Sequence, residues 1–323
     1  YNEARTRKPQ TFLESGDALG TMPGASAEGC DFCAWEELTA ECAWGRVEAE
    51  HAVTASNLFK VHGLHGLLLF KHHDPLRFDR PQLRDLLHVG DQWFRLAHAS
   101  NAAATHGMLI WNCLPRAGAS QFHGHAQTVL SEVEFPEGER VRRLAEGYHR
   151  RGLDYFAHVL RAHRALGLAS EWGPKGDKAH VYASISPWKD MEVVVLGSEL
   201  TSDSFVDALH CVLRCLIDRL GVQTFNVGIS NVGLGEPGRR RWTFVDSDEM
   251  ATDGERSSSN GGGDGPPLPL MARVVCRGDL QSRASDFGAL EVFGGSSIGK
   301  TDPFHIMDTI NDHRARLGSA SLA

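Results

Sequence analysis

The sequence lacks long hydrophobic runs and an excess of positive charge. None of its apolar stretches approaches the roughly 20 residues that a membrane-spanning helix needs. The formal net charge is −8 at pH 7, whereas a nucleic-acid backbone is usually met by a basic protein surface. We therefore expect no membrane span and no general nucleic-acid binding, while a small anionic ligand held by local donors remains compatible with the charge.

Cysteine is also scarce. The seven cysteines of the 323-residue chain do not form the dense pattern of a secreted disulfide scaffold, so a reducing compartment or metal binding is expected. The chain begins at Tyr1 rather than at Met, which is compatible with removal of a targeting peptide. We expect a soluble intracellular protein, either cytoplasmic or organellar.

The overall composition, with 41% hydrophobic and 23% charged residues, is typical of a globular protein. Apolar periodicity predicts strands and helices in an order that occurs twice. In the first half these are a strand at 63–70, a helix at 80–100, a strand at 107–114 and a long helix at 137–167, broken at Gly152. In the second half they are strands at 179–187, 191–197 and 223–233, a helix at 202–221, further strands at 272–278 and 288–294, and a helix near 303–317.

These elements predict an α+β fold of two halves, with largely antiparallel sheets packed against helices rather than a doubly wound parallel sheet. We expect an extended N-terminal arm at 1–29, an N-terminal domain at 30–170 and a C-terminal domain at 171–323. Residues 251–269 are polar and of low complexity, and we expect a mobile surface loop there.

Cys30 and Cys33 form a C-x-x-C pair that suits a zinc site. A redox pair is the weaker alternative, because this pair follows a glycine-rich segment rather than a strand, and unligated cysteines are a third. A closed tetrahedral site needs two further ligands. The sequence offers four candidates for them, in two pairs: His72, His73, His123 and His125.

Residues 112–127, NCLPRAGASQFHGHAQ, carry the strongest chemical signal in the sequence. If the segment is extended, His123, His125 and Gln127 project from one face, because side chains alternate along a strand. The small residues before them allow backbone N–H groups to approach an anion, and Ser120 and Gln127 can donate to phosphate oxygens. A neutral imidazole can attack phosphorus. The row therefore favours phosphoryl chemistry over a purely structural role.

The same residues resemble the active-site segment of the galactose-1-phosphate uridylyltransferase family, within the histidine-triad superfamily. That family's pattern is N-x-G-x-x-x-G-[AC]-S-x-x-H-P-H-x-Q, and this chain matches it at Asn112, Gly118, Ser120, His123, His125 and Gln127. ARTRKPQTF is similar to the family's N-terminal arm, CDFC to its zinc pair, SNLFKV to its nucleotide-contacting segment, and ISPWKDMEVVVLGSE and TFNVGISN to its second domain. The resemblance covers nearly the whole chain, and the arm is most similar to the ADP-glucose phosphorylase-like branch.

This resemblance implies two histidine-triad-like halves and a role for each matching residue. His125 is the expected nucleophile, which takes a nucleoside monophosphate from a nucleotide donor and passes it to a second phosphate compound, with Ser120 and Gln127 beside it. A structural Zn²⁺ is expected, and its implied ligands are Cys30, Cys33, His73 and His123. The implied contacts to nucleotide and phosphate are Arg5, Lys8, Asn57, Phe59, Asn112 and Gly118.

The chain departs from the family at several places, and Pro115 with Arg116 occupies the family's glycine-rich approach. Gly124 stands where the family has proline, which loosens the segment because glycine restricts the backbone less. An ungapped comparison puts Asp74 at the family's fourth zinc ligand, and we favour the preceding His73 over His72 and Asp74. Residues 211–304 contain no histidine, although relatives carry a histidine-containing strand near the sugar phosphate, so the sequence does not specify the acceptor.

The segment GGSSIGKT at 294–301 matches the phosphate-loop pattern G-x-x-x-x-G-K-[ST] and follows a predicted strand. Only 22 residues come after it, however, which is too few for the parallel sheet of a phosphate-loop protein, and Asp302 and Pro303 interrupt the next helical turn. We therefore interpret the match as a coincidental glycine-rich turn.

The resemblance implies a nucleotidyltransferase or nucleotide-sugar phosphorylase that works through a covalent nucleotidyl-histidine. Its expected partners are a nucleotide sugar or dinucleotide and a phosphate acceptor, with a homodimer as the expected assembly. An alternative is a catalytically weakened or inactive member that serves as a structural or regulatory subunit of a larger complex. In a third hypothesis water replaces the acceptor and the protein is a hydrolase.

Overall fold

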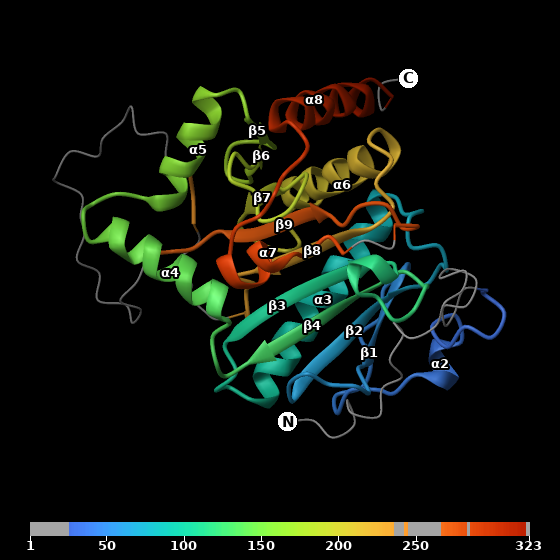
Figure 1. The fold of residues 1–323 in the computed structure, drawn as a ribbon. Coiled ribbons are helices and arrows are strands. Elements are labelled where there is room, and N and C mark those ends of the chain that lie inside the picture. The colour runs from blue at the N-terminus through green and yellow to red at the C-terminus, as the bar shows by residue number, and fades with distance from the viewer. Residues whose placement is uncertain (1–25, 236–241, 245–265, 283–284, 321–323) are drawn as a thin grey trace.

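Nine antiparallel strands form one continuous sheet in the computed structural model, which describes residues 26–235, 242–244, 266–282 and 285–320. Their order across the sheet is β1-β2-β4-β3-β8-β9-β7-β6-β5 (Figure 1). The strands are β1 (Ala52–Ser56), β2 (Leu64–Phe70), β3 (His106–Cys113), β4 (His125–Ser131), β5 (Ala169–Trp172), β6 (Ala179–Ala183), β7 (Val193–Gly197), β8 (Phe225–Ser230) and β9 (Leu270–Cys276). The predicted α+β architecture with a largely antiparallel sheet is confirmed.

The helices of the described residues lie between and around these strands. They are α2 (Trp35–Leu38), α3 (Arg80–Ser100), the 3₁₀ turn η1 (Pro115–Ala117), α4 (Pro136–His149), α5 (Tyr155–Ala165), α6 (Asp203–Asp218), α7 (Ala289–Gly294) and α8 (Pro303–Ala320). Helix α3 begins where the Asp79 side chain accepts from the Gln82 N–H and the Gln82 side chain accepts from the Asp79 N–H, a capping box that satisfies otherwise unpaired N–H groups. Gly152, with a φ of 73°, separates α4 from α5, as predicted. None of the described helices combines the length and apolarity needed to cross a bilayer.

The order strand, strand, helix, strand, strand occurs twice along the chain. The first repeat is β1-β2-α3-β3-β4 and the second is β6-β7-α6-β8-β9, and within the sheet each repeat has the same strand order. The repeats meet at the central pair β3–β8, where Asn112 lies opposite Asn226. The turns before β2 and β7 also correspond, because a bond from the Asn57 N–H to His65 O and one from the Ser184 N–H to Glu192 O enclose segments of equal length. Residues 57–65 thus correspond to residues 184–192.

The hydrophobic core lies between the sheet and helices α3, α6 and α8. Along β3 the alternate residues Leu109 and Trp111 face this core, whereas Ile110 and Asn112 line a cavity on the opposite face. The core side of the first repeat is filled by large side chains such as Trp93, which is 1% exposed and whose truncation to alanine would cost about 3–5 kcal/mol. The core therefore holds the sheet rigid under the cavity.

One sequence prediction is wrong, and two others lie mostly outside the described residues. Residues 288–294, predicted as a strand, contain helix α7, because the Glu291 carboxylate accepts from the Gly288 N–H and caps a helical turn. The apparent alternation was misleading, since Phe293 is 88% exposed and packs on no sheet. The predicted arm at 1–29 and the predicted loop at 251–269 fall mostly outside the described residues, which exclude 1–25 and 245–265.

Candidate active site

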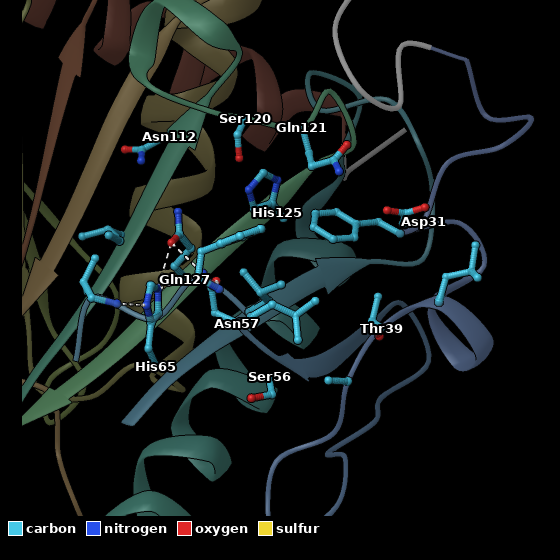
Figure 2. Close-up of a pocket in the computed structure, with 18 of the residues that line it drawn as sticks. Asp31, Thr39, Ser56, Asn57, His65, Asn112, Ser120, Gln121, His125 and Gln127 are labelled. Atoms are coloured by element: carbon cyan, nitrogen blue, oxygen red, sulfur yellow. Dashed lines mark hydrogen bonds between the residues drawn. The ribbon is translucent and has the colours of Figure 1, made fainter. Parts of the chain in front are cut away.

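A cavity of about 290 Å³ opens on the sheet face opposite α3, within the first repeat (Figure 2). Its wall combines strand residues of β2, β3 and β4 with the segments 31–40, 56–61 and 118–121. Seven lining residues carry polar or aromatic groups that bear on function: Asn57, Phe59, His65, Asn112, Ser120, His125 and Gln127. Six of these seven were predicted as site residues, and His65 was not.

His125 opens β4 and is 6% exposed. Its Nδ1 lies 2.8 Å from the carbonyl oxygen of His123. A carbonyl can only accept, so Nδ1 carries a hydrogen and donates it, and Nε2 is the ring nitrogen on the other side. Phe32 packs edge-on against this imidazole, with ring centroids 5.2 Å apart, which restricts its rotation. The site therefore contains an imidazole whose orientation is set by the His123 carbonyl and the Phe32 ring.

Gln127 follows on the same face of β4 and is held by hydrogen bonds to its carbonyl end. The Val61 N–H donates to Nδ1 of His65 (3.0 Å), so Nε2 of that ring carries the hydrogen and donates to Gln127 Oε1 (2.9 Å). Asn57 Nδ2 donates to the same oxygen (3.3 Å), while Asn57 Oδ1 accepts from the Phe59 N–H (2.8 Å). Because Oε1 is occupied, Gln127 offers its NH₂ group as the donor for a ligand.

The turn at 114–120 shapes the far wall of the cavity. Leu114 has a φ of 68° and Gly118 a φ of 95°. A positive φ is the conformation that favours glycine, which this chain has at residue 118. The Gly118 N–H donates to Pro115 O and the Ala119 N–H to Leu114 O. These two N–H groups stabilise the turn itself, so they are not available to an anion at this wall.

A second cluster lies next to His125. Cys30, Cys33, His73 and His123 each direct one potential ligand atom to a common point, with all four atoms within 4.8 Å of one another. The Cys33 sulfur is 3.3 Å from His73 Nδ1 and 3.4 Å from His123 Nδ1. These separations suit a tetrahedral metal with Zn–S bonds of about 2.3 Å and Zn–N bonds of about 2.0 Å. The cluster can therefore hold a metal ion.

The protonation of the cluster is consistent with this geometry. His123 Nε2 donates to Phe70 O (2.7 Å), which leaves Nδ1 free to act as a ligand. Burial lowers the pKa of His123 to about 4, so the ring is neutral at pH 7. Partial desolvation and the neighbouring Cys30 raise the pKa of Cys33 to about 11, because two thiolates repel each other without a cation.

His73 occupies the fourth position, and its two neighbours do not. The His72 ring packs against Phe70 with centroids 4.9 Å apart. The Asp74 carboxylate accepts from the Leu76 N–H and closes a local turn. The geometry thus supports the preference for His73 over the adjacent candidates.

Gly124 is held firmly between the two histidines of the row. Its N–H donates to His73 O (3.2 Å) and its carbonyl accepts from the Phe70 N–H (3.1 Å). A proline could not make the first of these bonds. A Cβ at this position would lie 3.1 Å from Pro75 Cα, which is a tight contact. Glycine therefore does not loosen the segment; it ties β4 to the metal cluster.

The segment 294–301 forms no anion cradle in this structure. The Asp190 carboxylate accepts from the N–H groups of Lys300 and Thr301, both at 2.9 Å, and from the Thr301 hydroxyl at 3.1 Å. An internal carboxylate thus takes the donors that a phosphate would use, and α7 stands where a phosphate loop would need a strand.

The second repeat has no histidine at the position equivalent to His125. The correspondence of residues 57–65 with 184–192 continues along the strands and makes Leu69 equivalent to Leu196. Leu69 pairs with His125, whereas Leu196 pairs with Met271. A thioether has no nucleophilic nitrogen, so only the first repeat carries the candidate chemistry.

By the same register, Arg273 stands where the first repeat has Gln127. Its guanidinium forms ion pairs with Glu137 (3.1 Å) and with Glu192 (3.3 Å). Glu192 is 2% exposed and corresponds to His65. This part of the second repeat is occupied by an internal ion network.

Two of the predicted phosphate contacts, Arg5 and Lys8, fall outside the described residues. Two residues that bear on the site were not predicted, His65 and Asn226. Each acts through a hydrogen bond to a cavity side chain on another strand, and the sequence gives no signal for such pairings.

No protein-family model matches the sequence, and no curated protein matches it. Solved structures do match. An Arabidopsis thaliana ADP-glucose phosphorylase with bound ADP-glucose is 14% identical, with a TM-score of 0.63, over 95% of this chain and 92% of that one. A GalT-like protein from A. thaliana is 15% identical (TM-score 0.64; 87% and 91% of the two chains), and a uridylyltransferase is 13% identical (TM-score 0.59; 84% and 88%). The chain has the fold of these proteins, as its resemblance to the galactose-1-phosphate uridylyltransferase family implied.

Proposed function

We propose that the protein is a nucleotidyltransferase or nucleotide-sugar phosphorylase that forms a covalent nucleotidyl intermediate on His125. One observation carries the proposal: a buried imidazole at the wall of a cavity, whose Nδ1–H is held by the His123 carbonyl, so that Nε2 is the ring nitrogen left to act as the nucleophile. The similarity in fold to a uridylyltransferase and an ADP-glucose phosphorylase supports it.

The reaction has two displacements at the same phosphorus. In the first, the Nε2 lone pair of His125 attacks the α-phosphorus of the donor, an N–P bond forms, and the P–O bond to the leaving phosphate breaks with its electron pair on oxygen. In the second, an oxygen of the acceptor phosphate attacks, an O–P bond forms, and the N–P bond returns its electrons to Nε2. Positive charge that develops on the ring in the first step is stabilised at Nδ1–H by the His123 carbonyl.

Three side chains are placed to stabilise the phosphoryl oxygens. Gln127 offers its NH₂ group, and Asn112 and Ser120 stand on the opposite wall (Figure 2). Such preorganised donors commonly contribute about 10²–10³ in rate each. The amide of Asn57 and the ring of Phe59 would line the nucleoside, and Arg5 and Lys8 remain proposed phosphate contacts.

The proposed metal is a structural zinc on Cys30, Cys33, His73 and His123. When bound there, it neutralises the two thiolates and cross-links the 30–33 segment to the start of β4. His123 then positions His125, because the carbonyl of one holds the imidazole of the other.

The substrate class proposed here is a nucleotide sugar or a dinucleotide, with phosphate or a sugar phosphate as acceptor. A screen of the purified protein against UDP-, ADP- and GDP-sugars and dinucleoside polyphosphates, with and without inorganic phosphate, tests it. Phosphate-dependent release of a nucleoside diphosphate is the expected outcome for a phosphorylase. Release of nucleoside monophosphate without any acceptor would instead show that the protein is a hydrolase.

A homodimer is the proposed assembly, and a place in a larger complex is the alternative. The segment around α7 exposes Val292 (60%), Phe293 (88%) and Ile298 (61%), and exposed apolar side chains of this number commonly mark a contact surface. Sedimentation of the native protein separates the two assemblies, since a homodimer has twice the 35.4 kDa chain mass.

A further inference from the structure

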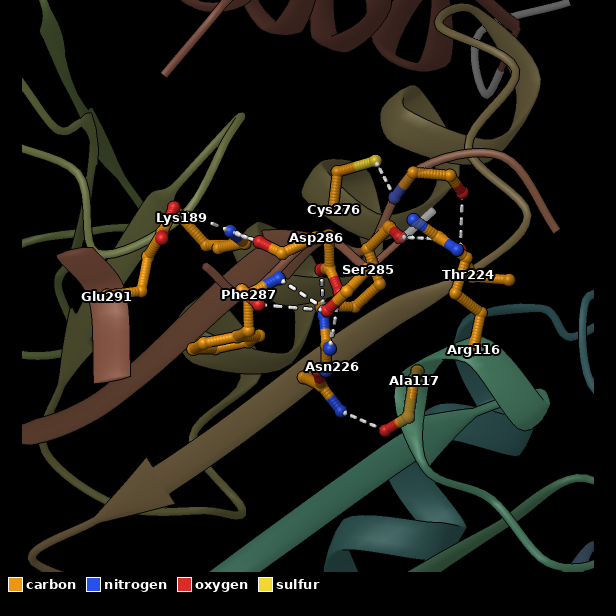
Figure 3. A network of polar contacts seen from close by, with 12 residues as sticks. Arg116, Ala117, Lys189, Thr224, Asn226, Cys276, Ser285, Asp286, Phe287 and Glu291 are labelled. Atoms are coloured by element: carbon orange, nitrogen blue, oxygen red, sulfur yellow. Dashed lines mark hydrogen bonds and ion pairs between the residues drawn. The ribbon is translucent and has the colours of Figure 1, made fainter. Parts of the chain in front are cut away.

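A chain of hydrogen bonds runs from the second repeat to the wall of the cavity. Figure 3 shows its part around Asn226 and Ala117. Arg277 Nη1 donates to Asn226 Oδ1 (2.6 Å). Asn226 Nδ2 donates both to Asn112 Oδ1 (2.7 Å) and to Ala117 O (2.8 Å). Asn112 is a cavity residue on β3, and Asn226 is its direct partner across the β3–β8 ladder.

The chemistry of the two ends fixes the direction of this chain. A guanidinium has only donors, so the Asn226 atom that faces Arg277 must be the carbonyl oxygen. A backbone carbonyl has only acceptors, so the Asn226 atom that faces Ala117 must be the NH₂ group. The same NH₂ group then meets Asn112, which has to present Oδ1 to it.

The consequence for Asn112 is that its own NH₂ group faces away from Asn226. Nδ2 lies 3.9 Å from the point that a Cβ on Gly118 would occupy, beside the wall where Ser120 also lines the cavity. Among the described residues, the side-chain hydrogen bond of Asn112 is the one that Oδ1 accepts from Asn226, and none is found from Nδ2. A donor without a protein acceptor at a cavity wall is suited to an anionic ligand.

The hydrogen-bond chain begins at Arg277, which is anchored in the second repeat. Arg277 makes two bonds to the Asp286 carboxylate, at 2.6 and 3.0 Å. Burial alone would raise the pKa of the Asp286 carboxyl, but the Arg277 guanidinium holds this pKa below its ordinary value. Arg116 donates to Arg277 O (2.5 Å) and to Ser282 O (2.7 Å) and so ties the cavity turn to the same segment.

We propose that Asn226 is a positioning residue: backed by Arg277, it locks the Asn112 amide so that the NH₂ group faces the phosphate subsite. The proposal rests on the proposed function, because it assigns a phosphate-bearing ligand to the cavity. It gives the second repeat a role in the chemistry of the first.

Asn226→Asp is the most direct test. The introduced carboxylate has the same shape and still accepts from Arg277, but it has no hydrogen to give to Asn112 or to Ala117. Asn112 is then expected to turn its NH₂ group toward the new carboxylate, which leaves its carbonyl oxygen facing the ligand. An acceptor in that position repels phosphate oxygens.

Binding is measured by calorimetry with ADP-glucose and UDP-glucose as phosphate-bearing probes and with adenosine and uridine as neutral probes. Asn226→Asp is expected to weaken binding of the phosphate-bearing probes by about 10- to 100-fold, which is the range expected for a hydrogen bond to a charged group. Binding of the neutral probes is expected to weaken by less than about twofold. Asn112→Asp, which keeps its bond from Asn226 but exposes an oxygen to the ligand, is expected to show the same selective loss and serves if the first variant folds poorly. Asn231→Asp, the same change at the end of β8 away from this cavity, is the matched control and should bind as the parent does.

A double-mutant cycle identifies the route of the effect. In an Asn112→Ala background, Asn226→Asp is expected to add less than about twofold, because its target is gone. Equal losses in both backgrounds, or an equal weakening of nucleosides and nucleotide sugars, would overturn the positioning role. A parent protein that binds the nucleotide sugars but never acquires a covalent nucleotidyl group would overturn the covalent mechanism and leave the Asn226 proposal standing. A parent protein that binds none of the phosphate-bearing probes would overturn both.

Discussion

Two backbone carbonyls set the orientation of His123 and His125. Phe70 O holds Nε2 of His123 and turns its Nδ1 toward the cysteines. His123 O in turn holds Nδ1 of His125 and leaves its Nε2 for the cavity. Two histidines two residues apart therefore have different orientations, because one carbonyl holds Nε2 of His123 and the other holds Nδ1 of His125.

The metal site gives a prediction at the level of single residues. His73→Ala is expected to lower zinc affinity by more than the roughly 10- to 100-fold that loss of an outer-shell partner costs, since it removes one of four converging ligands. Zinc content after dialysis against graded chelator measures this. His72→Ala is the matched control, because that ring faces Phe70 and not the cluster. Loss of zinc from the His72 variant with retention in the His73 variant would refute the assignment.

The residues of the site differ in how far the sequence could predict them. His125, Gln127 and the C-x-x-C pair are recognisable because their spacing along the chain is itself the signal. The position of His73 next to Cys33 depends on how the chain folds back over 40 residues, so the sequence favoured it only weakly over its neighbours. Asn226 could not be predicted, because its role depends on the register of β3 against β8.

Helix α6 carries a histidine that makes stability depend on pH. Burial, with a smaller contribution from Arg214, lowers the pKa of His210 to about 4 from an ordinary value of 6.5, while Asp79 and Asp207 oppose the shift. Between these two values the unfolded chain binds a proton that the folded chain does not, so this contribution to stability is present above pH 6.5 and is lost as the pH falls toward 4.

His210→Gln, which cannot take up a proton, is therefore expected to show a shallower fall in the free energy of unfolding between pH 7 and pH 5. Urea unfolding at several pH values measures the slope. The same change at the exposed His305 should leave the slope as it is in the parent. An unchanged slope in the His210 variant would contradict the stated cause.

The 294–301 segment gives a prediction for a loop. Lys300→Ala is expected to change the affinity for nucleotide by less than about twofold, because the Asp190 carboxylate already takes the donors of the loop. Asp190→Ala, by contrast, should lower the thermal midpoint, since loss of such a cap commonly costs about 1–2 kcal/mol. Calorimetric titration and thermal unfolding of both variants check this. A tenfold loss of nucleotide binding in the Lys300 variant would restore the phosphate-loop interpretation.

Most elements could be predicted from apolar periodicity, and the exceptions have physical causes. Helix α3 was predicted at its observed bounds because a capping box and a strict apolar face mark it. Helix α7 was mistaken for a strand, since its six residues are too few to show a helical period and its cap is a single side-chain bond. Strands β1 and β5 were missed because they are short and pair at the edges of the sheet.

At the scale of the whole molecule, two repeats share one sheet but not one chemistry. The first places an imidazole at the wall of a cavity, and the second places Met271 at the equivalent position. The second repeat contributes instead through the β3–β8 junction, where Asn226 reaches across to Asn112. Each chain is therefore expected to carry one reactive histidine.

The most direct measurement is nucleotidylation of the protein with a nucleotide sugar labelled in its α-phosphate, followed by mass-spectrometric location of the label. The account predicts one acid-labile nucleoside monophosphate per chain, on His125, with no label on His125→Ala and full labelling of the matched control His305→Ala. Labelling of His125→Ala to the level of the parent protein, or a stable label on any other residue, would contradict it.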